Sequence, residues 1–272
     1  MVLKKKFVFF NILLTFLPLG SLVSLANKTT LIASSLISIS LSAKVNAETS
    51  IFYFDRAIKK GEKGKYFEAI YDYMRAIEID PNYEDAYYNM AWAKTKINDY
   101  QGSIDDYSMA IAINQNSDQA FYGRGWSRSK LNNFYGAISD YTKAIQINPD
   151  YEDAYFARGY SKGELKNYSG SISDYNKALE INPKNATSYL NRGLMKSYLD
   201  NHFEAISDFT KAIETDSKKT DAYVNRGFSK VKVGDKKGAC KDYKKTKSLG
   251  FISSINDIWI ENNCKNKGFG LF

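Results

Sequence analysis

Oppositely charged side chains recur at a fixed spacing in this chain of 272 residues, and the spacing permits repeated ion pairs. An aspartate followed by Tyr or Phe returns every 34 residues, at Asp72, Asp106, Asp140, Asp174, Asp208 and Asp242. If each 34-residue repeat is counted from residue 50 onward, all six repeats carry a base at the eleventh position. Five also carry arginine at the seventh position: Arg56, Arg124, Arg158, Arg192 and Arg226. Because the seventh and eleventh positions lie one helical turn apart and share a face, the aspartate of a second helix could pair with one or both of these bases.

The presence of these charges in every repeat favours a structural role over a ligand site. We therefore predict structural ion pairs between two helices, with members that include Arg124, Asp140, Arg158, Asp174, Arg192 and Asp208. The second repeat departs from the pattern because Met90 replaces the arginine. If the pairs form within a repeat, Asp106 loses a partner there; if they form between repeats, it does not.

Groups for catalysis or metal binding are scarce. His202 is the only histidine, and Cys240 and Cys264 are the only cysteines. The sequence contains no recognisable Ser/His/Asp or Cys/His arrangement and no glycine-rich phosphate loop. Two separated thiols and one imidazole do not make a metal site. The sequence therefore predicts that the chain is not an enzyme and uses no cofactor or metal.

The two cysteines allow two interpretations. Cys240 occupies the position that holds isoleucine in earlier repeats, such as Ile206, and a free cysteine packs well at such an apolar position. In an oxidising compartment, Cys264 on the following segment could cross-link Cys240. Since the sequence does not show the geometry of the pair, a possible disulfide between Cys240 and Cys264 and a packed free thiol both stay open.

The elements that must position these residues are short helices. From Tyr151 to Pro183, apolar residues follow helical spacing that is interrupted once, near Lys166 and Asn167. Each repeat is thus expected to form a helix, a turn and a second helix. Proline, which cannot continue a helix, marks boundaries between repeats at Pro81, Pro149 and Pro183. One helix pair cannot bury its own apolar face, so the pairs must stack.

The pattern resembles the tetratricopeptide-repeat (TPR) family, and in particular exported bacterial members. The match consists of an aromatic residue at the fourth position of the repeat, Gly or Ala at the eighth, a small residue at the twentieth, an aromatic residue at the twenty-fourth, Ala at the twenty-seventh and Pro at the thirty-second. Gln115 and Ser217 depart from it in place of proline, and Thr246 in place of alanine. The resemblance implies an all-α, right-handed α-solenoid of six repeats (50–83, 84–117, 118–151, 152–185, 186–219, 220–253), followed by a C-terminal capping helix and tail over 254–272.

In this family the first helices line a concave face, and the second, fifth, ninth, twelfth and thirteenth positions of the repeat typically meet a ligand. Carried onto this sequence, the fifth and ninth positions give an aromatic ladder of Tyr88, Trp92, Tyr122, Trp126, Phe156 and Tyr160. The resemblance implies protein–protein interaction, with a groove for an extended, partly apolar peptide. The alternative is that these rings only pack against neighbouring helices. Stacking of a carbohydrate on the ladder is chemically reasonable, but no specific residue supports it.

Residues 1–47 have the form of an export signal. Lys4, Lys5 and Lys6 precede an apolar run over 7–26, and small residues at Val45-Asn46-Ala47 suit signal-peptide cleavage. The apolar run is also about long enough to span a bilayer uncleaved. We expect an exported protein that is periplasmic or secreted, or is anchored in the membrane by this segment. Membrane contact is expected only through that segment, and no nucleic-acid partner is expected.

The formal net charge of +8 is unevenly distributed. The first 47 residues contribute five lysines and no acid, so the rest of the chain carries only +3. From Lys218 to Lys247, ten lysines and Arg226 face three aspartates. A terminal repeat needs a polar outer face, so solvation explains these lysines most simply. The alternative function is attachment through this basic repeat to an anionic surface such as a membrane, a cell-wall polymer or nucleic acid.

Overall fold

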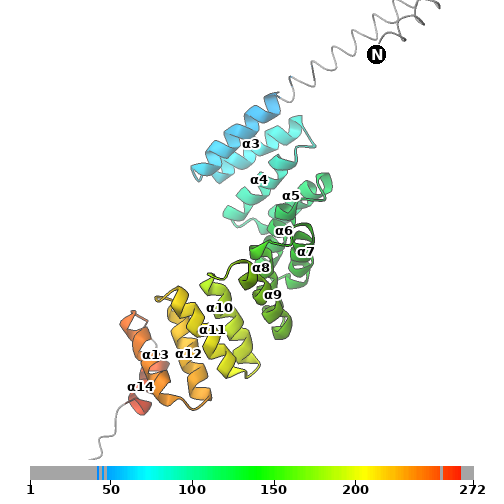
Figure 1. Cartoon of the computed structure of the whole chain (residues 1–272). Helices are drawn as coiled ribbons and strands as arrows, with labels where there is room; N and C mark the ends of the chain where they lie inside the picture. The colour runs from blue at the N-terminus through cyan, green and yellow to red at the C-terminus, as the bar shows by residue number, and fades with distance from the viewer. Residues whose placement is uncertain (1–41, 43–44, 46–47, 252–253, 265–272) are drawn as a thin grey trace, which may run out of the picture. The chain divides into compact units, whose positions relative to one another are not determined.

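The structure, a computed structural model, describes residues 42, 45, 48–251 and 254–264, with the backbone alone over 254–258. Every regular element in these ranges is a helix, which confirms the predicted all-α repeat fold (Figure 1). The chain divides into two compact units, residues 1–86 and residues 87–272. The predicted leader, 1–47, and the tail, 265–272, lie almost wholly outside the described residues. None of the described helices is both long and apolar enough to cross a membrane.

Consecutive helices form antiparallel pairs, one pair for each repeat. In the first unit, residues 48–62 are helical and pair with α3. The first helices of the next repeats have 13 residues, and the second helices have 14 except for α13. The labelled helices are α3 (Tyr66–Ile79), α4 (Glu84–Lys96), α5 (Tyr100–Ile113), α6 (Asp118–Lys130), α7 (Phe134–Ile147), α8 (Glu152–Glu164), α9 (Tyr168–Ile181), α10 (Ala186–Tyr198), α11 (His202–Thr215), α12 (Thr220–Lys232), α13 (Lys236–Ser248) and α14 (Ser254–Asn263).

A short turn joins the two helices of each repeat. One turn residue takes a left-handed backbone conformation, and the residues at this position are Gly64, Asn98, Asn132, Lys166, Asp200 and Gly234. Glycine and asparagine tolerate this conformation, which explains their frequency there. In the third repeat, Asn133 then caps α7 by accepting a hydrogen bond from the backbone N–H of Gly136 at 3.0 Å. Turn and cap together fix where α7 begins.

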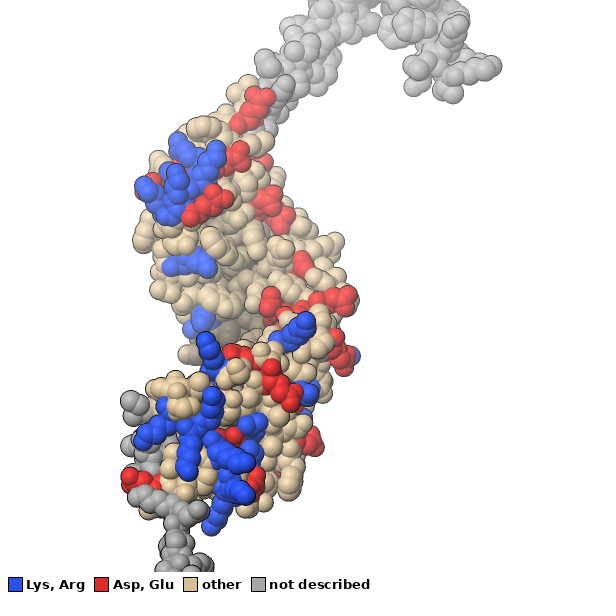
Figure 2. Space-filling view, turned by 60° about the vertical axis from the view of Figure 1, so that its left-hand side comes forward, with Lys and Arg blue, Asp and Glu red and all other residues tan. Residues whose placement is uncertain are grey.

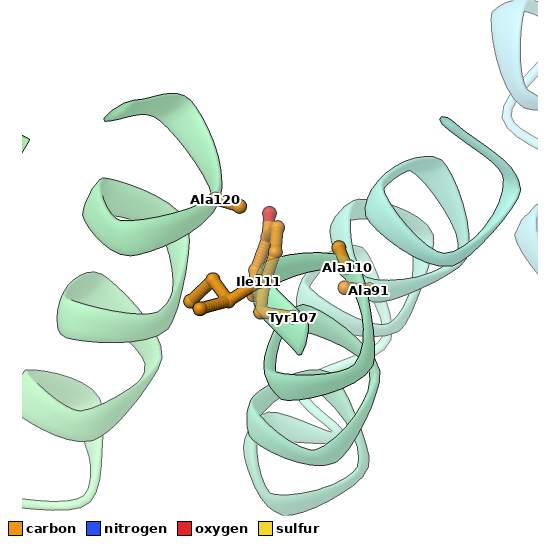
Figure 3. Close-up of a cluster of buried hydrophobic side chains, with 5 residues drawn as sticks. All are labelled: Ala91, Tyr107, Ala110, Ile111 and Ala120. Atoms are coloured by element: carbon orange, nitrogen blue, oxygen red, sulfur yellow. The ribbon is translucent and has the colours of Figure 1, made fainter. Parts of the chain in front are cut away.

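Small residues in the first helix accommodate one large ring from the second helix. In the second unit, Tyr107 and Ile111 of α5 pack with Ala91 of α4 and Ala120 of α6 (Figure 3). Burial of Tyr107 raises the pKa of its hydroxyl far above the usual value. In the next repeat a Cβ on Gly125 would lie 2.8 Å from the ring of Tyr141, so only glycine permits this approach. The small residues and the aromatic residues that recur in the sequence thus pack against one another in the core.

The C-terminal end of the second unit is closed by α14, which packs on α13. Trp259 meets the ring of Tyr243 edge to face, with the ring centroids 5.0 Å apart. A disulfide joins Cys240 on α13 to Cys264 directly after α14, and their Cα atoms are 5.6 Å apart. The last helix is therefore held to the array by a covalent bond and by packing that includes the contact of Trp259 with Tyr243.

Candidate binding groove

An ion-pair cluster joins the two helices of each repeat. In the third repeat, Arg124 donates to both carboxylate oxygens of Asp140, at 3.0 Å and 2.8 Å. Arg128 Nη1 lies 2.7 Å from Asp140 Oδ2. Asp140 is only 2% exposed, so two cations rather than water compensate its charge. An arginine and a lysine hold the aspartate in the same way at Asp72, Asp174, Asp208 and Asp242. The pairs lie within a repeat, not between repeats.

The arginine of each cluster in the second unit also contacts the preceding repeat. Arg124 Nη1 donates to Ser108 Oγ on α5 at 3.1 Å, and its guanidinium lies 5.5 Å from the ring centroid of Phe121. One side chain thus joins α5, α6 and α7. The equivalent acceptors on preceding second helices are Thr142 for Arg158, Asn176 for Arg192 and Thr210 for Arg226.

The second repeat lacks this arginine, and its aspartate has one cation. Lys94 Nζ lies 2.6 Å from Asp106 Oδ2, while Met90 is buried in the arginine's place. Asp106 is 7% exposed. Burial raises its pKa to about 6, although the hydrogen bond with Lys94 acts in the opposite direction. The charge of Asp106 is therefore less well compensated than that of Asp140.

The predicted aromatic ladder divides into two sets of residues with different surroundings. The rings at the fifth position pack against the core tyrosine of the same repeat: Tyr88 against Tyr107, Tyr122 against Tyr141, and Phe156 against Tyr175. Their centroids lie 5.5 to 5.7 Å apart, which is normal for packed aromatic pairs. These three rings contribute to the core as well as to the surface.

The rings at the ninth position are more open to solvent. Trp92 is 39% exposed and Tyr160 is 46% exposed, whereas Trp126 is half-buried. Trp126 meets Tyr100, and Tyr160 meets Phe134, in both cases on the second helix of the preceding repeat. The ammonium groups of Lys96 and Lys130 lie 4.7 Å and 5.0 Å from the ring centroids of Trp92 and Trp126. This set therefore presents aromatic edges and cations together.

Two neighbouring pockets in the second unit share Tyr160. The first, between α6, α7 and α8, has a volume of about 330 Å³ and is lined by Tyr122, Trp126, Lys130, Phe134, Phe156 and Tyr160, among others. The second, between α8, α9 and α10, has a volume of about 290 Å³, and its lining includes Tyr160, Glu164, Tyr168, Asn191, Leu194 and Tyr198. We call these two adjoining pockets the aromatic groove. Tyr88 and Trp92 line neither pocket.

The sequence analysis missed several residues of the aromatic groove. Phe134 and Tyr168 stand at the seventeenth position of the repeat. Lys130, Glu164 and Tyr198 were not named, although they stand at the thirteenth position, which the family resemblance assigns to ligand contact. Tyr168 and Tyr198 stack with centroids 5.2 Å apart. An aromatic residue at the seventeenth position in the first four repeats, and histidine in the fifth, was the available signal for the former set.

The groove combines apolar rings with charges of both signs. Burial raises the pKa of Tyr122 to about 12, so its hydroxyl stays protonated at neutral pH. The pKa of Tyr160 is also raised, first by burial and then by neighbouring Glu164. Lys130 borders one pocket and Glu164 the other. This lining can receive large apolar side chains and hydrogen-bond a polar backbone, whereas no cluster of His, Cys, Asp and Glu that could hold a metal occurs among the described residues.

Helix pairs that repeat every 34 residues, with the two helices of each pair joined by a buried aspartate and its cations, define a helical-hairpin repeat protein. The chain contains repeats of the tetratricopeptide type. Models described as TPR repeat match residues 62–94 and 160–196, and models described as tetratricopeptide repeat match residues 119–151 and 186–219. No curated protein sequence matches the chain.

Solved structures with the same fold include a MamA protein, which is 27% identical, with 63% of this chain and 94% of that chain covered and a TM-score of 0.60. YrrB, described as a TPR protein with an unusual peptide-binding site, is 18% identical, with 70% and 97% covered and a TM-score of 0.61. PilF of Pseudomonas aeruginosa is 15% identical, with 80% and 98% covered and a TM-score of 0.66. The last two likenesses concern the fold alone.

Proposed function

We propose that the chain is an exported, non-catalytic scaffold that binds an extended, partly apolar segment of another protein in the aromatic groove. The presence of tetratricopeptide-type repeats supports a role in protein–protein interaction. Two adjoining pockets share Tyr160, and this arrangement is the reason for proposing an extended peptide as the ligand. An extended peptide can place one large side chain in each pocket, while a compact small molecule would fill only one.

The chemistry of the lining supports a peptide over a purely apolar ligand. Tyrosine and tryptophan offer apolar area together with a hydrogen-bonding edge. The edges of Trp126 and Tyr160 are oriented by Tyr100 and Phe134 on the preceding repeats, which reduces the entropy lost when a ligand binds. Lys130 and Glu164 allow the groove to distinguish peptides by charge.

A Tyr160→Ala substitution tests the groove, because it removes the ring that both pockets share. Peptides selected for binding from a random display library should carry two large apolar residues. We expect their affinity to fall by about 10- to 100-fold in the variant, as for a hot-spot aromatic residue. Fluorescence anisotropy with a labelled peptide measures this loss, and a thermal melt checks that the fold is retained.

Phe228→Ala is the matched control for this experiment. Phe228 occupies the same position of the last repeat, is 47% exposed and has a lysine over its ring, but lines neither pocket of the groove. Its replacement should leave peptide affinity unchanged. Equal losses in the two variants, or no loss in Tyr160→Ala, would show that the peptide binds elsewhere.

The export part of the proposal rests on residues 1–47, with their basic start and apolar run. The protein is then periplasmic or secreted, or is held at the membrane by that segment. A reporter enzyme that works only in the cytosol, joined after Asp55, should be inactive in cells. Full reporter activity would contradict export.

A further inference from the structure

A pocket beside the disulfide is lined by four lysines of α13. Lys236, Lys237, Lys241 and Lys244 line it together with Cys240, Asn263 and Cys264, and its volume is about 540 Å³. We call it the lysine pocket. All four lysines are exposed. Figure 2 shows lysine and arginine side chains gathered over this C-terminal part of the second unit. The disulfide holds Asn263 and Cys264, at the end of α14, as the far wall of the pocket.

The charge of the lysine pocket is not a general property of the repeats. The four lysines stand at the seventeenth, eighteenth, twenty-second and twenty-fifth positions of the last repeat. None of the five preceding repeats has a lysine at any of these positions. A polar outer face alone would be satisfied by serine, glutamate or lysine, so the need for solubility does not by itself explain four lysines together.

Within the described part of the chain, none of the four lysines forms an ion pair. The acids of α13 are Asp235, which caps the helix, and Asp242, which is paired with Arg226 and Lys230. The second helices α9 and α11 instead carry pairs between exposed side chains, Lys177 with Glu180 and Lys211 with Glu214. Lys244 stands where the second to fifth repeats place the Ser, Thr or Asn that contacts the arginine of the next repeat, and no repeat follows the last one to supply such an arginine.

We propose that the lysine pocket binds the phosphate groups of an anionic lipid surface. Each lysine near such a surface contributes separately to binding, so four exposed ammonium groups act together without a preformed grip on one ligand. A single free phosphate is typically held by an arginine fork, and no arginine lines the pocket. Single-stranded nucleic acid would need aromatic rings for base stacking, and the pocket has none.

Lysine footprinting on the full-length protein tests this site without any substitution. The protein is mixed with vesicles of phosphatidylglycerol or of phosphatidylcholine, labelled by reductive methylation and analysed by mass spectrometry. With phosphatidylglycerol, labelling of the four pocket lysines should slow about tenfold, and the protection should disappear at about 0.5 M salt. Four exposed lysines elsewhere serve as internal controls, namely Lys59, Lys63, Lys143 and Lys184, and should change less than about twofold.

Two further arms identify the source of the phosphate. Inorganic pyrophosphate at the same phosphate concentration should protect the pocket lysines less than about twofold, because it lacks the summed field of a surface. An oligonucleotide should protect them less than the anionic vesicles do. Equal protection by pyrophosphate, stronger protection by the oligonucleotide, or equal protection of pocket and control lysines would each overturn the proposal.

Discussion

Replacement of Asp140 by asparagine should lower the free energy of unfolding by about 3–5 kcal/mol, because it leaves Arg124 and Arg128 without their shared counter-charge. Asparagine keeps the shape of the side chain but offers one acceptor and places an amide donor against a cation. Because Arg124 is then no longer anchored by a carboxylate, its hydrogen bond to Ser108 on the preceding repeat should also weaken. Urea denaturation followed by circular dichroism measures the change.

Asp106→Asn is the matched control, because Asp106 occupies the same position in the second repeat with one cation instead of two. At pH 7 it should cost less than about 1 kcal/mol, since a buried and poorly compensated charge is removed together with the ion pair. Hydrogen exchange should then show loss of protection at α6 and α7 in Asp140→Asn and little change at α4 and α5 in Asp106→Asn. Equal losses of stability in the two variants would mean that the second cation contributes nothing.

The raised pKa of Asp106 gives this comparison a pH dependence. In the folded state the pKa of Asp106 is about 6, whereas in the unfolded chain it is near 3.8. Between these two pH values the folded state therefore binds a proton that the unfolded chain releases. The contribution of Asp106 is therefore fully present below about pH 4 and is lost as the pH rises through about 6. Between these limits the stability of the natural protein relative to Asp106→Asn should fall by about 3 kcal/mol. A constant difference across this range would contradict the assigned cause, which is burial.

The ion-pair clusters show what helical periodicity can predict and what it cannot. Spacing places Arg124 and Arg128 on one face of a helix, but it does not say whether the facing aspartate belongs to the same repeat. The structure pairs them within the repeat, and it adds the hydrogen bond from Arg124 to Ser108, which sequence reasoning missed. A signal for that bond was present, because Ser, Thr or Asn stands at the twenty-fifth position wherever the next repeat has arginine after it.

The aromatic groove also shows that helical periodicity does not predict how side chains pack. The family resemblance placed Tyr122, Phe156 and Tyr160 on one surface, yet two of them also pack on core tyrosines. How deeply a ring is buried depends on the neighbouring second helix, and no helical period in the sequence describes that neighbour. Phe134 and Tyr168 escaped notice for this reason, since they reach the groove from second helices. The leader stays a prediction from residues 1–47.

Replacement of Cys264 by serine should destabilise the C-terminal end by about 3 kcal/mol, because the disulfide closes a loop between residues that are 24 apart in the sequence. The helix it retains, α14, has only 10 residues and packs on α13 through contacts such as Trp259 on Tyr243. A helix of this length is not stable by itself in water, so its docking depends on the bond. Hydrogen exchange should therefore show the loss at α13 and α14 before any loss at α6 or α7. Reductant should lower the stability of the natural protein to that of Cys264→Ser and leave the variant unchanged; an unfolding curve of the natural protein that does not respond to reductant would show that α14 is held by packing alone.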